Sequence, residues 1–293
     1  MNILPYFIRG LAAGGQFALV AIGYTMVYGI LKLINFAHGD LFMLSGIMLI
    51  YLCSSFPTMP IWAAMLWMIV LIVFIGFLIE KCAYSPLRTA PRMSVMISAI
   101  GVSYLLQNLV CYITGGLSKQ FPDIPFISES VKLFGVKDKL TVFISPIVSL
   151  ILMAILVLII NHTKFGMSMR AVSKDFETSQ IMGVKINRVI SITFAIGAFL
   201  AAAGSLLYFA KNTGINHLSG STPGIKAFIA AVIGGIGSVP GAVVGALIIG
   251  VVESLAKAFG LADFSDVISF AILILILVVK PTGIFGEKTT EKV

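Results

Sequence analysis

The stretch INFAHGDLFMLSG, residues 34–46, places three polar side chains within six residues in an otherwise apolar part of the chain. We expect Asn35 to cap a helix that begins at Phe36, because its side-chain oxygen can accept hydrogen bonds from the first-turn N–H groups. His38 and Asp40 then fall in that first turn, where a carboxylate suits the positive end of the helix dipole.

Two interpretations of this stretch stay open at the level of sequence. It can be a capped helix end beside a loop, or a broken helix that lines a solute path. A break inside a bilayer persists only where protein or a water-filled route surrounds its backbone. In either case Gly39 and Gly46 let a second helix approach closely. The candidate path residues of this stretch are Asn35, His38, Gly39 and Asp40.

A second stretch, residues 234–254, reads GGIGSVPGAVVGALIIGVVES and is too rich in glycine for a helix that faces lipid. Residues 237–241 predict a turn between two segments. The small residues after the turn favour tight helix packing. A phosphate-binding loop is excluded, because no Gly-Lys-Ser/Thr follows the glycines. Beside the packing interpretation, three glycines are candidate path residues: Gly234, Gly235 and Gly237.

Residues 162–188 read HTKFGMSMRAVSKDFETSQIMGVKINR, with apolar residues spaced as in two short amphipathic helices. Asp175 and Glu177 fall at the start of the second helix, and Gly183 can end it in a left-handed conformation. A helix that exposes apolar residues outside the membrane needs a partner to cover them. The candidate docking residues are Arg170, Asp175, Phe176, Glu177, Ile181, Met182 and Gly183.

The elements that position these residues follow from composition. The chain is 59% hydrophobic and 11% charged, whereas soluble proteins carry about 25% charged residues. Residues 60–79 and 140–160 contain no charge, and each stretch is long enough to cross the hydrocarbon core as a helix. The stretches are too continuous for a membrane β-barrel. The chain is therefore predicted to be an all-α, polytopic integral membrane protein in a lipid bilayer.

Other features of the sequence exclude further classes. The net charge of +8 is attributed to basic loops and not to nucleic-acid binding, since no basic stripe or aromatic motif accompanies it. The first residues do not fit a signal peptide, because Arg9 interrupts the apolar part early. The three cysteines show no CxxC spacing and are expected to be apolar filler.

Hydropathy predicts nine membrane segments, of which 40–54 and 224–237 are short. Either short segment can span the membrane or re-enter it, so eight or nine spanning helices are expected. The predicted segments are 6–30, 40–54, 60–80, 93–114, 140–161, 189–210, 224–237, 241–258 and 266–280.

Lysine and arginine orient these segments. The loops 81–92, 162–188 and 280–292 are basic, and they include Lys288 and Lys292, whereas 115–139 is nearly balanced. The positive-inside rule places the basic loops in the cytoplasm, with the N-terminus outside and the C-terminus inside.

Two similar hexapeptides precede the two short segments. INFAHG covers residues 34–39 and INHLSG covers residues 215–220, on opposite sides of the membrane by the charge rule. An inverted-topology repeat would produce this arrangement. The corresponding halves would be 1–114 and 189–280.

Three blocks in this order resemble the permease subunits of high-affinity branched-chain amino acid ABC transporters, the LivH type, over nearly the full length. They are GGQFALVAIGYTMVYGILKLINFAHGDLFMLSG, MRAVSKDFETSQIMGVKINRVISITFAIGAFLAAAGSLLY and GIKAFIAAVIGGIGSVPGAVVGALIIGVVES. The resemblance implies one permease domain over residues 1–293. It also implies that residues 162–188 dock the ATPase subunits, although Thr178 and Ser179 stand where alanines are common.

The resemblance further implies leucine, isoleucine or valine as the solute, in a prokaryotic cytoplasmic membrane. The implied partners are a related second permease, two ATP-binding subunits and an extracytoplasmic solute-binding protein. ATP would then bind the partner subunits, this chain would hold no cofactor, and it would not be an enzyme.

Alternatives remain open. Related permeases for urea, amides or other amino acids share the same blocks. An ion-driven carrier or a channel would not need the amphipathic segment 162–188. An intramembrane hydrolase would need a nucleophile and a base, and no GxSxG-like motif with a second partner occurs.

Overall fold

The computed structural model confirms a helical, polytopic chain. Within the described residues, eight helices are long and apolar enough to cross a membrane, and a further apolar helix, Ser221–Gly234, is shorter. The predicted basic positions Lys288 and Lys292 lie outside the described residues. The structure describes residues 3–88, 90–125, 127–133, 135–212 and 214–286.

The observed helices begin and end within a few residues of the predicted segments. A π-helical turn, Glu80–Tyr84, and a 3-10 turn, Ser85–Leu87, extend the third helix. The helices are α1 (Leu4–Leu31), α2 (His38–Ser55), α3 (Ile61–Ile79), α4 (Arg92–Thr114), α5 (Leu140–His162), α6 (Lys164–Lys174), α7 (Phe176–Ile181), α8 (Ile186–Phe209), α9 (Ser221–Gly234), α10 (Val239–Ala258) and α11 (Ser265–Val279).

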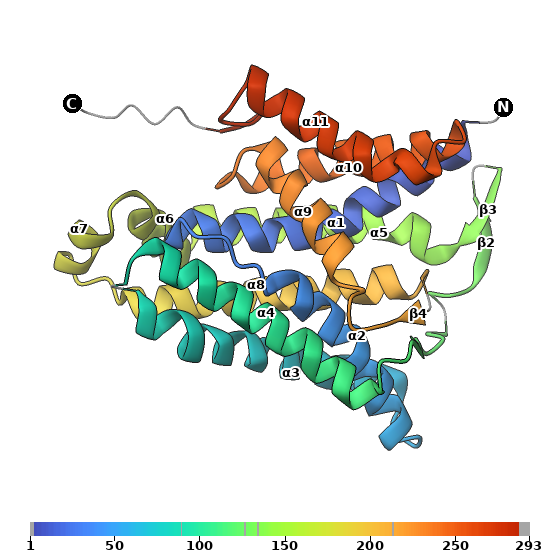
Figure 1. Ribbon diagram of the computed structural model, residues 1–293, viewed down its shortest axis with the longest axis horizontal. Coiled ribbons are helices and arrows are strands. Elements are labelled where there is room, and N and C mark those ends of the chain that lie inside the picture. The colour runs from blue at the N-terminus through green and yellow to red at the C-terminus, as the bar shows by residue number, and fades with distance from the viewer. Residues whose placement is uncertain (1–2, 89, 126, 134, 213, 287–293) are drawn as a thin grey trace.

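The long helices lie side by side along the long axis of the molecule (Figure 1). At one end, called here the α7 end, α6 and α7 project beyond the bundle. At the other end, called the hairpin end, lie short strands that hydropathy does not predict. They are β1 (Lys119–Gln120), β2 (Ser130–Leu133), β3 (Val136–Lys139) and β4 (Gly214–Ile215). β2 pairs with β3 and β1 with β4, both antiparallel.

An ion pair attaches the hairpin to α1. The Arg9 Nε atom lies 2.6 Å from Asp138 Oδ2, and the Lys139 N–H donates to the other oxygen of Asp138. Burial by itself raises the pKa of Asp138. The hydrogen bonds and the charges of Arg9 and Lys211 outweigh that effect and hold the pKa below the ordinary aspartate value.

Helix α1 forms the centre of the bundle and packs against α5, α8, α9 and α10. Its small residues permit this, because helices in lipid associate through close backbone approach. A Cβ atom at Gly14 would lie 2.8 Å from the Cα atom of Leu247 on α10, and one at Gly15 would lie 3.0 Å from Pro146 on α5. The outward faces of α3, α4, α5 and α11 carry exposed apolar side chains, as lipid or another membrane subunit requires.

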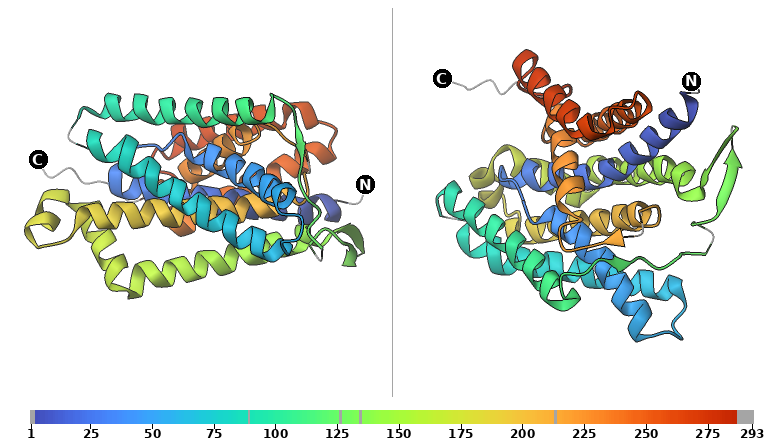
Figure 2. Two further views of the ribbon diagram at one scale, coloured as in Figure 1. Left: turned by 90° about the horizontal axis from the view of Figure 1, so that it is seen from below. Right: turned by 45° about the vertical axis from the view of Figure 1, so that its right-hand side comes forward.

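Helices α2 and α9 both begin in the middle of the bundle and run in opposite directions (Figures 1 and 2). α2 runs to the hairpin end and α9 to the α7 end. Each helix from α8 to α11 likewise runs opposite to its counterpart from α1 to α4. This is the polarity that an inverted repeat requires. The division into repeat halves stays a prediction.

Candidate functional site

The starts of α2 and α9 meet in the middle of the bundle, and we call this contact the α2–α9 crossing. A Cβ atom at Gly39 would lie 2.9 Å from the carbonyl oxygen of Gly220 and 3.1 Å from the Cα atom of Gly224. The last residues of the two similar hexapeptides therefore touch. Only glycine permits this backbone contact.

His38 fills the space behind the crossing. It is buried, and its ring meets that of Tyr24 edge-on, with centroids 4.8 Å apart. Gly23 on α1 and Gly197 on α8 leave room for the imidazole. Among the described residues, Nε2 of His38 has no hydrogen-bond partner. His38 is thus packed between α1 and α8.

The expectation that Asn35 caps a helix from Phe36 is wrong. α2 begins at His38, and no side chain caps it. The carbonyl of Asn35 accepts from the His38 N–H in the preceding turn, and its side-chain oxygen accepts from the Tyr84 hydroxyl at 2.8 Å. A buried tyrosine hydroxyl needs an acceptor, and the π-helical turn after α3 carries Tyr84 to Asn35. Sequence reasoning missed Tyr84, because nothing local links it to Asn35.

Asp40 lies in the first turn of α2, as expected, and is buried. Its Oδ1 accepts from Gln107 Nε2 on α4 at 2.9 Å, and Gln107 also donates to Ser103 at 3.3 Å. Gln107 thus ties α4 to α2 through the carboxylate of Asp40.

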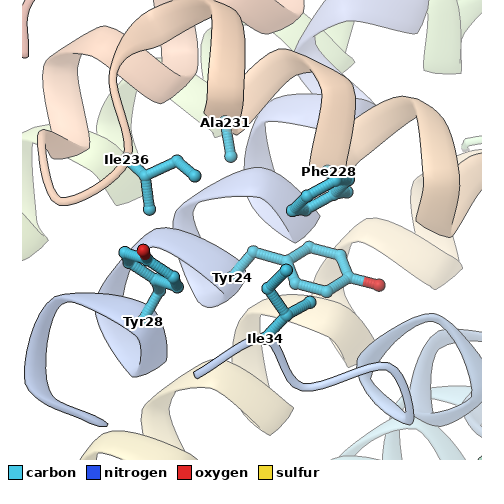
Figure 3. A pocket seen from close by; sticks show the side chains of 6 residues that line it. All are labelled: Tyr24, Tyr28, Ile34, Phe228, Ala231 and Ile236. Atoms are coloured by element: carbon cyan, nitrogen blue, oxygen red, sulfur yellow. The ribbon is translucent and has the colours of Figure 1, made fainter. Parts of the chain in front are cut away.

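A small cavity lies between α1 and α9 on the α7 side of the crossing. Figure 3 shows Tyr24, Tyr28 and Ile34 facing α9 and the turn after it across a cavity of about 10 Å³. Such a cavity has room for about one water molecule, so no amino acid fits there. The residues on the other side are Phe228, Ala231 and Ile236.

The glycines 234–241 pack two helices together. Cβ atoms at Gly234 and Gly241 would each collide with the backbone of the other residue, and Gly235 and Gly237 have positive φ angles of +101° and +102°. The Phe285 N–H also donates to the carbonyl of Gly234 at 2.9 Å. The close contact expected from the small residues is present, whereas a role of these glycines in the solute path stays a prediction.

Segments α6 and α7 form the predicted pair of short helices (Figure 2). Asp175 caps α7, and hydrogen bonds from the side chain and backbone of Thr178 lower its pKa. Gly183 has φ +83°, as predicted, and open space around it. The side chains of Ile181 and Met182 are 85% and 78% exposed. An apolar surface of this kind requires a covering partner.

The other three docking candidates differ in their surroundings. Phe176 is 41% exposed and extends the apolar surface of α7, and Glu177 lies beside it in the first turn. Arg170 instead donates to the carbonyl of Ile160 at 2.6 Å and to Asn161 Oδ1 at 3.2 Å. Its guanidinium therefore supplies hydrogen-bond donors to acceptors in the last turn of α5.

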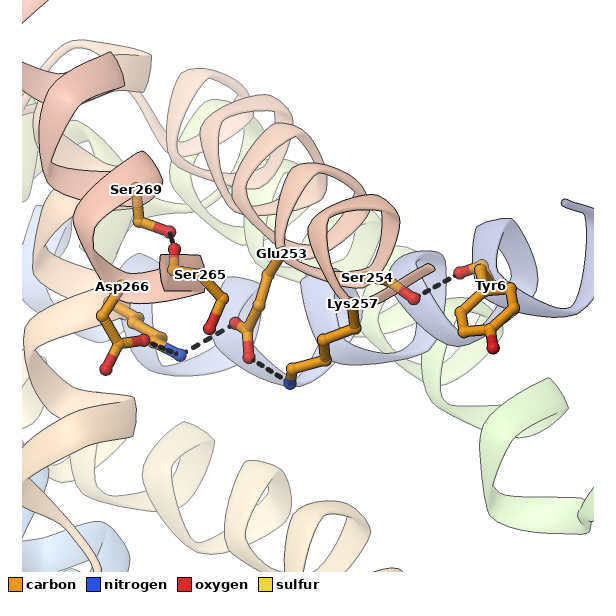
Figure 4. A network of polar contacts seen from close by, with 8 residues as sticks. Tyr6, Glu253, Ser254, Lys257, Ser265, Asp266 and Ser269 are labelled. Carbon is orange, nitrogen blue, oxygen red and sulfur yellow. Dashed lines mark hydrogen bonds and ion pairs between the residues drawn. The ribbon is translucent and has the colours of Figure 1, made fainter. Parts of the chain in front are cut away.

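An ionic cluster near the hairpin end was missed (Figure 4). Glu253 and Lys257, four residues apart on α10, form an ion pair at 2.6 Å. Lys226 on α9 adds to it, with Nζ 2.9 Å from Glu253 Oε2 and 2.8 Å from Asp266 Oδ1 on α11. A single lysine inside the predicted segment 224–237 is the sequence signal for this cluster, since intramembrane charge is rare without a partner.

Comparisons with known proteins agree with this architecture. A family described as the branched-chain amino acid transport system permease component matches residues 6–277. The high-affinity branched-chain amino acid transport system permease proteins LivH of Salmonella typhimurium and Escherichia coli K12 are each 38% identical over 305 positions, which cover 100% of this chain and 98% of theirs. The corresponding protein BraD of Pseudomonas aeruginosa is 39% identical over 304 positions, with the same coverage.

Proposed function

The chain belongs to the family of branched-chain amino acid transport permeases, and we propose that it carries leucine, isoleucine or valine as one subunit of an ATP-driven importer. The full-length identity of 38–39% to permeases named for this transport is the observation that carries the proposal. ATP would bind partner subunits. The complete importer would add a related second permease, two ATPases and an extracytoplasmic solute-binding protein.

Uptake into vesicles tests this function. The complete importer, reconstituted with ATP inside and binding protein outside, is expected to accumulate labelled leucine, isoleucine and valine. Urea and short amides should neither accumulate nor compete. Uptake of urea or an amide in place of the three amino acids would assign the chain to another solute class.

Helix α7 is proposed as the docking element for the ATPases. The exposed apolar side chains Phe176, Ile181 and Met182 support this assignment, because they project beyond the bundle on a short, well-capped helix. The proposal also sets the orientation: the α7 end faces the cytoplasm, where ATP is available, and α1 begins on the outer side.

Cysteine labelling tests the orientation. In a variant that lacks the three native cysteines, Lys174→Cys at the end of α6 should react with an impermeant thiol reagent only after the cells are opened. A cysteine in the β2–β3 turn, at Gly135, should react in intact cells. The reverse pattern would invert the proposed topology.

The α2–α9 crossing is proposed as the part of the solute path that must open during transport. His38, Asp40 and Asn35 lie immediately behind it and are buried. Their polar groups could then line the path only after the crossing separates. Gly39 sets how closely α2 and α9 approach each other before the crossing separates.

A further inference from the structure

A polar groove lies between α9 and α11. Its cavity of about 90 Å³ is lined by Thr222, Ile225, Lys226, Ile229, Asp266 and Phe270, among others. The four α9 residues have the spacing i, i+3, i+4 and i+7, so they share one face of the helix. At about 100° per residue this face is opposite the face that Gly220 and Gly224 place in the α2–α9 crossing.

The groove contains charges that the packing of the bundle does not need. Replacing a buried ion pair by apolar residues of similar volume is often neutral or stabilising. Here Lys226 nevertheless lies between Glu253 and Asp266, and Lys257 also pairs with Glu253. The cluster holds two positive and two negative groups, so its own net charge is zero. A ligand that carries one charge of each sign can pair with it and leave the site neutral.

Asp266 is the part of the cluster that leaves room for a ligand. Its side chain is 55% exposed, although it pairs with a lysine that is nearly buried. The side chain of Glu253 is 9% exposed and already has a lysine ammonium on each of its oxygens, so the contacts open to a ligand are those of Asp266 and Lys226 in the groove.

From this arrangement we infer that the groove binds the zwitterionic backbone of a free amino acid in transit. Asp266 receives the α-ammonium group, and Lys226 receives the α-carboxylate. The exposed apolar side chains Ile225 and Phe270 contact the branched side chain. This inference rests on the proposed function and adds a defined solute site on the permease itself.

The position of the groove suits the arrival of solute. Asp266 lies in the first turn of α11, which begins at the hairpin end, and α9 leads from the groove toward the α7 end. With the hairpin end outside, the groove lies on the side from which an amino acid enters. The same chemistry, an ammonium beside an anion, also occurs in the headgroup of phosphatidylethanolamine, so the test separates the two ligands.

Protection of a cysteine in the groove tests the site. Thr222→Cys is introduced into a permease without native cysteines, and the complete importer is placed in nanodiscs of phosphatidylglycerol. A charged methanethiosulfonate reagent should modify this cysteine, and saturating L-leucine should slow the reaction by about tenfold, in line with charge-assisted contacts. Leucinamide and N-acetyl-leucine, which each lack one charge, should not slow it. Val278→Cys, on an exposed apolar part of α11, is the control that should not react.

The charges themselves are tested by uptake. Asp266→Asn should lower leucine uptake by about tenfold in an importer that still assembles, and in the Thr222→Cys background it should abolish the protection by leucine. Asp266→Glu should restore part of both. Asp263→Asn, an exposed neighbour outside the cluster, should behave as wild type. If Asp266→Asn fails to assemble, the protection measured in the Thr222→Cys variant still decides the question.

Three results would overturn the site. They are the absence of protection by leucine, equal protection by the two analogues, and wild-type uptake by Asp266→Asn. Slowed labelling in discs that contain phosphatidylethanolamine, together with indifference to leucine, would assign the groove to a lipid headgroup instead. In each case leucine uptake by the wild-type importer is measured in parallel, so the proposed function can stand while the groove fails.

Discussion

Substituting Gly183 by valine tests whether α7 couples the permease to ATP hydrolysis. Gly183 has φ +83°, and a Cβ atom there would meet nothing within 4 Å. The cost of Gly183→Val is therefore backbone strain and not collision. A left-handed conformation costs an L-residue about 1–2 kcal/mol, and β-branched residues tolerate it least.

This strain acts on a small element. The end of α7 is held by hydrogen bonds from the Gly183 N–H to Gln180 and from the Val184 N–H to Ser179, both of 3.0 Å. A strain of about 1.4 kcal/mol shifts the balance between the formed and unwound helix end by about tenfold. α7 has six residues and exposes most of its side chains, so the membrane bundle should keep its stability. We expect normal insertion, weaker retention of the ATPases and a loss of solute-stimulated ATP hydrolysis.

The assay measures ATPase retention during purification and leucine-stimulated hydrolysis in reconstituted importers. Two matched controls separate the mechanism from general damage. Gly183→Asn should be close to wild type, because asparagine tolerates the left-handed region. Gly135→Val introduces the same strain at φ +79° in open space, but in the hairpin turn at the opposite end. Wild-type retention and hydrolysis in Gly183→Val, or an equal loss in Gly135→Val, would refute a coupling role for α7.

Three further substitutions test other parts of the structure. Gly39→Ala should lower the free energy of unfolding by about 1–3 kcal/mol, because the added Cβ atom meets the backbone of α9 and forces the crossing apart. The control is Gly101→Ala, in open space on α4, which should leave thermal stability and uptake unchanged. Tyr84→Phe should lower the free energy of unfolding by about 1–3 kcal/mol by leaving the buried acceptor of Asn35 unpaired, and an unchanged melting temperature would contradict the contact. Because the pKa of Asp138 is lowered in the folded protein, its ionised carboxylate stabilises the fold at pH values above about 3.9, the ordinary aspartate pKa. This stabilisation is lost as the pH falls through the lowered pKa. Asp138→Asn should therefore flatten that part of the pH profile of thermal unfolding.

The membrane segments and the ends of short helices could be predicted from the sequence, since both depend on local chemistry. A long apolar stretch must form a helix wherever it crosses lipid, because its backbone has no other hydrogen-bond partners there. The predicted segment 140–161 is accordingly α5, Leu140–His162. The cap at Asp175 and the positive φ of Gly183 follow equally from preferences that act within a few residues.

The partners of the polar groups could not be predicted, since they are far apart in sequence. The local preference of Asn35 for a helix cap competes with the need of the buried Tyr84 hydroxyl for an acceptor, and the contact between distant helices decides between them. The charge of Lys226 is visible in the sequence, whereas its position between Glu253 and Asp266 depends on how α9, α10 and α11 pack. Local chemistry thus determines which segments enter the membrane. Which polar groups meet there depends on close packing among helices, because buried charges and hydrogen-bonding groups must be satisfied by whatever neighbour the tertiary structure brings near.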